Sequence, residues 1–315
     1  MATRELGRSG LHTAPFSLGG NVFGWTADEK RSFEVLDAFV DAGGSLIDTA
    51  DKYSAWVPGN VGGESETIIG NWLRKSGKRS KVLIATKAGM DLGGDRKGLS
   101  RRHLLRSVDE SLARLQTDCI DLYQAHVDDP STPFEETLGT LADLIRAGKI
   151  RAIGASNYTA ERLAAALSAS DRLGLPRFQT LQPEYNLVSR AGFESALQPL
   201  CVREQVSVIP YYALASGFLT GKYRRAGDGA GGARSGRAAS YLNERGLRIL
   251  AALDAVAARL ATTQTAVAIA WCRDRPAVAA PIASATSVAQ LADLLSGMRL
   301  ALDAQAREQL DEASR

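Results

Sequence analysis

Residues 119–156 have the sequence CIDLYQAHVDDPSTPFEETLGTLADLIRAGKIRAIGAS, and this stretch decides the fold. Its two ends, 119–126 and 150–156, are short runs of mainly apolar residues and predict buried strands. Between them, residues 134–147 carry apolar side chains at every third or fourth position, which predicts an amphipathic helix. A strand, a helix and a second strand at this spacing form a βαβ unit, in which the two strands are parallel.

The same alternation continues in both directions along the chain. Strands are predicted at residues 15–20, 45–48, 82–87, 119–126, 150–156, 178–182, 206–211 and 277–282. Helices are predicted at residues 28–42, 64–76, 100–114, 134–147, 159–173, 193–204, 243–260 and 287–296. Repeated βα units without a break long enough for a linker favour the α/β class, as a closed (β/α)8 TIM barrel rather than an open doubly wound sheet. We therefore expect one domain over residues 1–315.

Three further segments lie outside this alternation. The N-terminal sequence around Gly7 and Gly10 predicts a β-hairpin that caps the bottom of the barrel, and residues 302–315 predict an extra C-terminal helix. The glycine-rich stretch 227–237 follows the seventh predicted strand, whereas the Rossmann GxGxxG motif follows the first. We interpret it as part of a loop, at 224–240, that is a candidate lid.

Composition excludes several classes of protein. The 315 residues are 45% hydrophobic and 23% charged, as in ordinary globular proteins. No apolar run approaches the ~18 residues of a membrane span, and the N-terminus lacks a secretory signal, so we expect a cytoplasmic protein without a membrane partner. The net charge of +3 comes without a basic cluster interleaved with aromatic residues, which argues against nucleic acid. Neither metal-ligand spacing nor a GxSxG motif occurs, so no metal and no hydrolase nucleophile are expected.

Four ionisable residues stand at or just after the ends of consecutive predicted strands. Asp48 ends the second strand and is followed by Tyr53, Lys87 ends the third, and His126 ends the fourth. The carboxyl ends of barrel strands meet at one mouth, so these side chains are expected in one pocket. A lysine beside a tyrosine lowers the phenol pKa from about 10 and makes it a usable acid. Asp48 would hold the lysine, and His126 would orient a substrate carbonyl.

Each of these residues taken alone also fits a structural role. Lys87 and Asp48 suit a buried ion pair, Tyr53 suits the core, and a single histidine is commonly satisfied by packing. All four together at strand ends favour catalysis, because the strand interiors are almost wholly apolar.

These residues lie in motifs by which the sequence resembles the aldo-keto reductase family. The motifs are IDTADKY (47–53), ATKAG (85–89), LYQAH (122–126), GASNY (154–158), TLQPEYNL (180–187), PYYALASGFLTGKY (210–223) and PIASATSVAQL (281–291). They extend over nearly the whole chain. The resemblance implies reduction of an aldehyde or ketone by NAD(P)H, with Asp48, Tyr53, Lys87 and His126 as the catalytic tetrad.

The resemblance also implies a dinucleotide site. Its expected contacts are Gly20, Asn21, Asp48, Ser156, Asn157, Gln182, Tyr211, Ala213, Leu214, Ser216, Gly217, Lys222, Ser284, Thr286 and Gln290. Within this set, Tyr211 is expected to stack on the nicotinamide ring, and 213–222 resembles the family's diphosphate loop. Many NADPH-selective members carry Arg where this chain has Thr286 and Asn where it has Leu294. NADPH is our expectation, and NADH is the alternative.

The substrate is a small-molecule carbonyl compound or sugar that the sequence does not identify. Trp25 and Trp56, with Tyr53 and His126, are expected to line its pocket, and Tyr185 is a further candidate for the wall. Two other functions stay open. One is NAD(P)+-dependent oxidation of a sugar or alcohol, and the other is a cofactor-binding regulatory subunit with little turnover, like the channel-associated β subunits that resemble this family. The sequence gives no indication of the oligomeric state.

Overall fold

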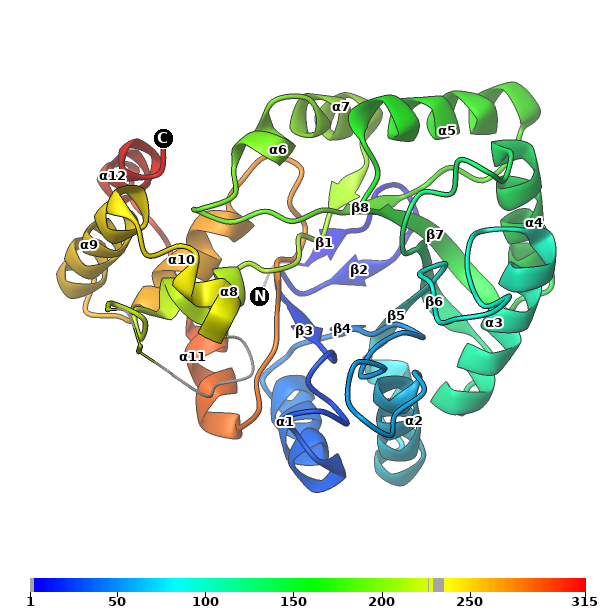
Figure 1. Cartoon of the computed structure of the whole chain (residues 1–315), viewed down its shortest axis with the longest axis horizontal. Coiled ribbons are helices and arrows are strands. Elements are labelled where there is room, and N and C mark those ends of the chain that lie inside the picture. The colour runs from blue at the N-terminus through cyan, green and yellow to red at the C-terminus, as the bar shows by residue number, and fades with distance from the viewer. Residues whose placement is uncertain (1–2, 226, 229–234) are drawn as a thin grey trace.

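The computed structural model describes residues 3–225, 227–228 and 235–315. Figure 1 shows a ring of strands at the centre of the molecule with helices packed around it. The strands of the ring are β3 (Ser17–Gly19), β4 (Leu46–Asp48), β5 (Leu83–Ala88), β6 (Ile120–Ala125), β7 (Ile150–Ser156), β8 (Thr180–Gln182), β9 (Ser207–Val208) and β10 (Ile282–Ala283). Each lies within or beside a strand predicted from the sequence.

The sheet closes on itself. Its strand order is β10-β3-β4-β5-β6-β7-β8-β9, and every neighbouring pair is parallel. The open edges meet where Val208 of β9 forms a parallel bridge with Val278, with backbone hydrogen bonds of 2.8 Å to Ala277 and from Ala279. The eighth predicted strand, 277–282, is therefore divided: its first half makes this closing contact, and β10 itself begins only at Ile282. The predicted TIM barrel of the α/β class is confirmed.

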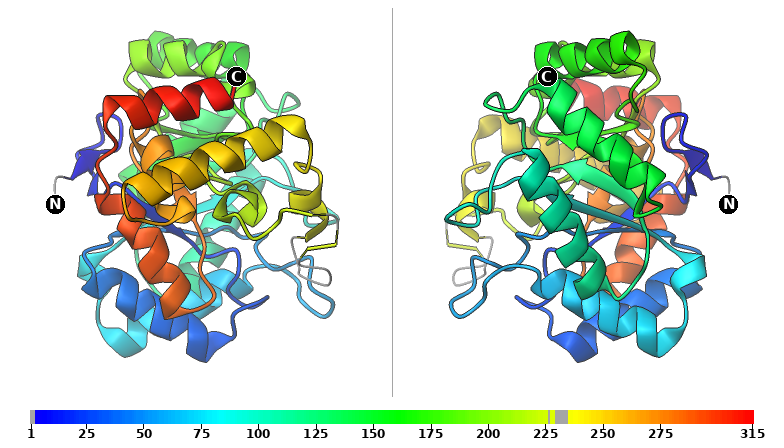
Figure 2. Two further views of the ribbon diagram at one scale, coloured as in Figure 1. Left: turned by 90° about the vertical axis from the view of Figure 1, so that its left-hand side faces the viewer. Right: turned by 90° about the vertical axis from the view of Figure 1, so that its right-hand side faces the viewer.

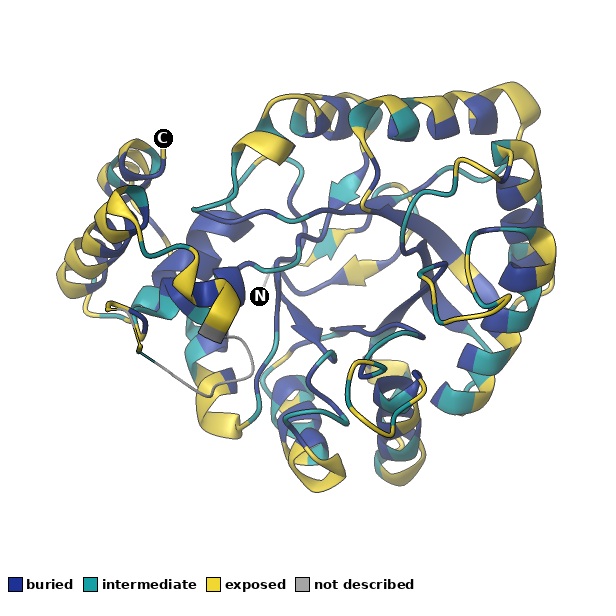
Figure 3. Cartoon of the chain, in the orientation of Figure 1, coloured by how far each residue is buried: buried dark blue, intermediate teal, exposed yellow. Residues whose placement is uncertain are grey.

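Helices cover the outer face of the barrel. In the described chain they are α1 (Glu29–Asp41), α2 (Glu64–Ser76), α3 (Arg101–Leu115), α4 (Phe134–Arg146), α5 (Ala160–Leu173), α6 (Ala191–Glu194), α7 (Leu197–Glu204), α8 (Ser235–Ala239), α9 (Glu244–Arg259), α10 (Gln264–Arg273), α11 (Val288–Arg299) and α12 (Ala304–Ala313), with 3-10 turns η1 (Arg79–Lys81) and η2 (Ala215–Thr220). Figure 3 shows their inner faces buried and their outer faces exposed. None of the described helices is long and apolar enough to cross a membrane.

The bottom of the barrel is plugged by the N-terminal hairpin. Strands β1 (Arg4–Glu5) and β2 (His12–Thr13) pair antiparallel, as predicted. The turn between them buries Leu6 and Leu11 against side chains such as Leu122 inside the barrel. Figure 2 shows the hairpin at one end of the barrel and α8 at the other. The hairpin therefore closes this end of the barrel to a ligand.

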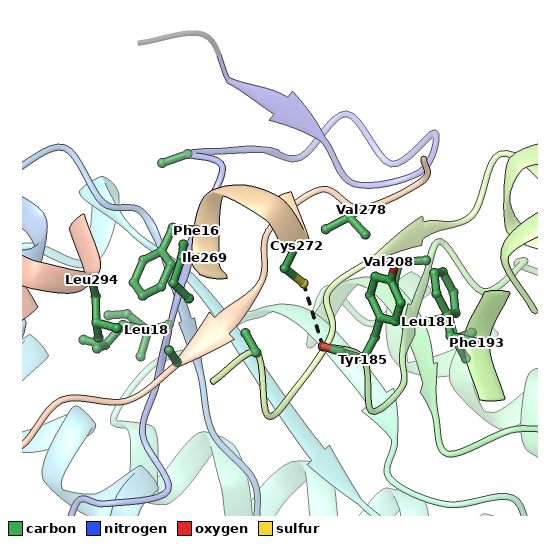
Figure 4. Close-up of a cluster of buried hydrophobic side chains, with 14 of the residues drawn as sticks. Phe16, Leu18, Leu181, Tyr185, Phe193, Val208, Ile269, Cys272, Val278 and Leu294 are labelled. Carbon is green, nitrogen blue, oxygen red and sulfur yellow. Dashed lines mark hydrogen bonds between the residues drawn. The ribbon is translucent and has the colours of Figure 1, made fainter. Parts of the chain in front are cut away.

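Helix α10 was not predicted from the sequence, and neither was the short helix α8. Every residue from Thr265 to Arg273 is buried, because α10 packs against the barrel on one side and against α9 on the other. In Figure 4, Ile269 and Cys272 belong to a buried cluster with Phe16 and Val208. A helix buried all round has no polar face and so lacks the periodicity that indicated the other helices.

The predicted helix at 243–260 is α9, and it lies outside α10 rather than directly on the strands (Figure 1). The C-terminal helix predicted at 302–315 is α12, which packs against α9. The candidate lid at 224–240 includes residues 226 and 229–234, which lie outside the described residues. The described part of that segment contains α8.

The close packing of α2 on α3 makes Gly70 a test of the fold. A Cβ at Gly70 would lie 2.1 Å from the carbonyl oxygen of Arg114, which is backbone and cannot move away freely. Gly70→Ala is therefore expected to lower the free energy of unfolding by about 1–3 kcal/mol. Gly139 in α4 is the matched control, because a Cβ there would meet no atom within 4 Å.

Gly139→Ala is expected to raise the free energy of unfolding by roughly 0.5–1 kcal/mol, since alanine loses less backbone entropy in a helix. Urea unfolding of both variants measures the two changes. Equal effects of the two substitutions on the free energy of unfolding would show that α2 and α3 do not pack closely at Gly70.

Candidate active site

The carboxyl ends of the strands open into a cleft of about 890 Å³. It extends from Asp48 and His126, at the ends of β4 and β6, to Thr286 and Gln290, at the start of α11. All strands of the barrel point the same way, so side chains remote in sequence meet at this mouth. The volume is within the range of pockets that hold small molecules and cofactors.

Asp48, Tyr53, Lys87 and His126 form one cluster at an end of the cleft. Lys87 Nζ donates to Asp48 Oδ2 at 2.9 Å and to the Tyr53 hydroxyl at 3.0 Å. The Tyr53 hydroxyl donates to Asp48 Oδ2 at 3.1 Å. The rings of Tyr53 and His126 meet edge to face, with centroids 6.1 Å apart. A phenol, an ammonium, a carboxylate and an imidazole thus share one small volume.

Burial dominates the electrostatics of this cluster. It raises the pKa of Tyr53 well above the usual value, and the charge of Asp48 together with its hydrogen bond raises it further. This direction is opposite to the one expected from Lys87 alone, because burial and the charge of Asp48 outweigh the effect of the ammonium. Burial also lowers the pKa of His126 well below its usual value, and the charges of Lys87 and Lys52 add to that shift. The resting cluster therefore holds a protonated phenol and a neutral imidazole.

Polar side chains beside the cluster are tied to it by hydrogen bonds. Gln182 Nε2 donates to Asp48 Oδ1 at 2.8 Å. Asn157 Nδ2 donates to the backbone carbonyl of His126 at 2.9 Å, and Asn157 Oδ1 accepts from the Tyr211 hydroxyl at 2.8 Å. Asn157 has φ 59°, a left-handed conformation that asparagine adopts more readily than most residues. These amides and the Tyr211 ring therefore have fixed positions next to Tyr53.

The middle of the cleft is formed by residues 213–222. Ser216 and Gly217 have φ values of 58° and 92°, so the backbone turns sharply there. A Cβ on Gly217 would lie 3.2 Å from Lys222 Cε, which means that glycine allows the backbone and the lysine to approach. Lys222 Nζ lies 5.1 Å from the centroid of the Tyr223 ring. Among the described residues, no carboxylate lies within salt-bridge distance of this ammonium.

The far end of the cleft is the N-terminus of α11. Ser287 caps the helix by accepting from the Gln290 N–H, and the Thr286 N–H and hydroxyl both donate to Gln290 Oε1, at 3.0 and 3.1 Å. The Ser284 hydroxyl donates to Asn21 Oδ1 at 2.6 Å. A helix N-terminus favours an anionic ligand through its free N–H groups and its dipole.

Most of the residues predicted for the site line this cleft. Those at its wall are Asn21, Asp48, Tyr53, Trp56, His126, Ser156, Asn157, Gln182, Tyr211, Ala213, Leu214, Ser216, Gly217, Lys222, Ser284, Thr286 and Gln290. Gly20 and the fully buried Lys87 are not part of the wall. Trp25 contacts Trp56 edge to face, with centroids 5.6 Å apart, and also lies outside the wall. Tyr185, the further candidate for the wall, is a core residue packed against other aromatic rings and does not line the cleft.

The model of the aldo/keto reductase family matches residues 15–315. The chain belongs to this family. It is therefore an oxidoreductase, as the motifs indicated, and the family generally uses NAD(P)H and small-molecule substrates. No three His, Cys, Asp or Glu side chains in the described parts of this aldo/keto reductase are grouped so that they could hold a metal ion.

Curated proteins from bacteria and plants are similar to this reductase. Protein tas of Escherichia coli (strain K12) is 33% identical over an alignment of 327 residues, which covers 96% of this chain and 94% of that protein. Aldo-keto reductase YhdN of Bacillus subtilis (strain 168) is 40% identical over 220 residues, 69% of this chain and 61% of that protein. A probable voltage-gated potassium channel subunit beta of Arabidopsis thaliana is 33% identical over 299 residues, 92% and 89% of the two chains.

Several residues that line the cleft were not predicted from the sequence, among them Lys52, Met90, Tyr212 and Arg237. Lys52 precedes Tyr53 on the same loop, and that position was a usable signal. Arg237 comes from α8, where its guanidinium lies 4.2 Å from the Tyr212 ring centroid and pairs with Glu184 at 2.8 Å. Such contacts between distant loops leave no pattern in the sequence.

A second group of buried ionisable residues was also missed. Glu66 stands on the buried face of α2, where it accepts from Thr86 Oγ1 at 2.5 Å and from Arg114 Nε at 2.7 Å. Asp51 is 3% exposed, and its Oδ1 has no hydrogen-bond partner among the described residues. Burial raises the pKa of Asp51 to about 7, the charge of Glu66 adds to the shift, and Arg114 opposes it.

Asp51→Asn is expected to make the stability of this reductase less dependent on pH. The Asp51 pKa is about 7 in the folded chain and about 3.9 in an unfolded one. The folded state therefore binds this proton more tightly, and wild-type stability should fall as the pH rises from about 4 to about 7. The amide does not ionise, so the variant should exceed the wild type in stability at about pH 8 and lose most of this advantage at about pH 5.

Urea unfolding at the two pH values measures this difference. Asp118→Asn, a change at an exposed aspartate, is the control and should give the same small effect at both. A variant of Asp51 that is equally destabilised at both pH values would contradict a protonated carboxyl at this position.

Proposed function

We propose that this protein reduces an aldehyde or ketone to an alcohol with NADPH, and that Tyr53 is the general acid. The observation that carries the proposal is the hydroxyl of Tyr53, which lies at the cleft wall within hydrogen-bond distance of both Lys87 and Asp48. His126 lies beside it. A proton donor with a cation behind it and a neutral imidazole next to it suits protonation of a carbonyl oxygen.

The cleft fits a nicotinamide dinucleotide along its length. Asn157, Gln182 and Tyr211 would hold the nicotinamide, since the two amides offer both donors and acceptors and the ring offers a flat face. The uncompensated ammonium of Lys222 suits the diphosphate, and the N-terminus of α11 suits the adenosine phosphate. When bound, the reduced coenzyme supplies a hydride to the carbonyl carbon.

The proton comes from this chain's own residues. A carbonyl oxygen placed between Tyr53 and His126 accepts a hydrogen bond from each, which polarises the carbonyl. As the oxygen becomes an alkoxide it takes the Tyr53 proton, and the phenolate that remains lies 3.0 Å from the ammonium of Lys87. The raised pKa keeps Tyr53 protonated until that moment. Lys87 therefore stabilises the product state of the proton transfer more than the resting state.

One observation favours catalysis over a purely regulatory role. Asp48, Tyr53, Lys87 and His126 are all present in hydrogen-bonded or ring contact, which a purely regulatory subunit does not require. Oxidation of an alcohol would use the same residues with Tyr53 as the base, so the direction depends on the coenzyme and substrate supplied.

Tyr53→Phe is expected to lower kcat by ~100- to 10,000-fold with every carbonyl substrate, because it removes only the general acid. NADPH binding should persist. The decay of NADPH absorbance with a panel of aldehydes and ketones measures the first effect, and a fluorescence titration measures the second.

Tyr158→Phe is the matched control, because that buried hydroxyl has no partner in the described chain and its ring packs against Phe178. Unchanged turnover in Tyr53→Phe would remove the phenol from the mechanism. Tight NADPH binding by the wild type with negligible turnover on the whole panel would instead favour a regulatory role.

The coenzyme preference is a separate prediction. NADPH is expected to bind more tightly than NADH, because its additional phosphate meets the N-terminus of α11 near Thr286. The lysine and arginine residues that line the cleft in the described chain are Lys52, Lys222 and Arg237, and none belongs to this end. Thr286→Arg should therefore strengthen NADPH binding by roughly tenfold and change NADH binding less. Fluorescence titrations with both coenzymes measure this, and a clear NADH preference in the wild type would reverse the assignment.

A further inference from the structure

The cationic side chains that line the cleft differ in whether a carboxylate is paired with them. The guanidinium of Arg237 is paired with Glu184 at 2.8 Å. Lys52 and Lys222 also line the cleft, and neither has a carboxylate within salt-bridge distance among the described residues. An ammonium without a counter-ion in a partly enclosed cleft attracts an anionic ligand.

The two lysines belong to different parts of the cleft. Lys222 closes the 213–222 loop, where the proposed dinucleotide would supply its counter-charge. Lys52 precedes Tyr53, and its Nζ donates to the backbone carbonyl of Asp91. A carbonyl carries no net charge, so this bond positions the ammonium without neutralising it. The carboxylate of Asp91 is paired with Lys97 at 3.6 Å. The charge of Lys52 makes a smaller contribution to lowering the Asp91 pKa, but no salt bridge between Lys52 and Asp91 occurs in the described structure.

Lys52 faces the space in which the substrate carbonyl is expected. Lys52 and His126 both line this cleft. After burial and the charge of Lys87, the charge of Lys52 is the next contribution that lowers the pKa of His126. Trp56 is 47% exposed beside them, and its ring meets Tyr53 edge to face with centroids 6.2 Å apart. This part of the cleft therefore combines an aromatic wall with a cation.

We propose that Lys52 binds a carboxylate or phosphate group of the substrate, so that the preferred substrates are aldehydes or ketones that carry an anion. The inference rests on the carbonyl reduction proposed above. An ammonium on a flexible four-carbon chain is a point charge that accepts an anion over a range of distances from the carbonyl. Trp56 would cover the apolar part of such a molecule.

The test compares matched neutral and anionic aldehydes. One pair is para-tolualdehyde with para-carboxybenzaldehyde, and the other is glycolaldehyde with glycolaldehyde phosphate, so the two pairs distinguish carboxylate from phosphate. The wild type should show a kcat/KM at least ~10-fold higher for an anionic member. Lys52→Met should remove this preference, chiefly by raising KM for the anion, whereas Lys52→Arg should retain most of it.

Lys97→Met is the control, because it removes an exposed lysine that also contacts Asp91 but does not line the cleft. It should leave the preference for anions unchanged. If Lys52→Met lowers kcat/KM equally for neutral and anionic aldehydes, Lys52 only holds the Asp91 segment and the inference is overturned. Wild-type turnover without any preference for anions also overturns it and leaves the reductase function intact, whereas no turnover of any aldehyde overturns both.

Discussion

The buried ion pair between Lys87 and Asp48 is the interaction on which the site depends. Lys87 is 0% exposed, and moving an ammonium out of water costs several kcal/mol unless its partners are well placed. Here the carboxylate oxygen of Asp48 lies at 2.8 Å, the backbone carbonyl of Thr49 at 2.6 Å and the Tyr53 hydroxyl at 3.0 Å. The position of the phenol is thus set by the need to satisfy a buried charge, and the proposed proton transfer would use the same geometry.

The carboxylate of Asp48 links the two halves of the site. One of its oxygens accepts from Tyr53, and the other accepts from Gln182 on β8. The residues proposed to hold the nicotinamide are therefore hydrogen-bonded to the same group that orders the acid. Such a shared acceptor fixes the distance between coenzyme and proton donor before any ligand arrives, which is the preorganisation that hydride and proton transfer require.

The barrel and the convergence of the four ionisable residues were predictable because both follow from periodicity. Parallel strands bring their carboxyl ends to one mouth whatever their side chains are, so Asp48, Lys87 and His126 had to approach one another. The direction of the Tyr53 pKa shift was not predictable, since the sequence shows a neighbouring cation but not the burial that outweighs it. The burial of Glu66 was not predictable either, because it depends on the contact between α2 and α3.

The missed helix α10 has a consequence for how the chain is made. Its C-terminal end is tied to α12 through the hydrogen bond from Trp271 to Asp311 at 2.9 Å, and Arg275, just after α10, forms an ion pair with Asp311 at 3.0 Å. Because α12 leaves the ribosome after α10, the side chains of Trp271 and Arg275 lack this partner until the last part of the chain is made. Until then the nascent chain exposes apolar surface around Trp271, to which chaperones or neighbouring chains can bind. Docking of the C-terminal helix covers this surface.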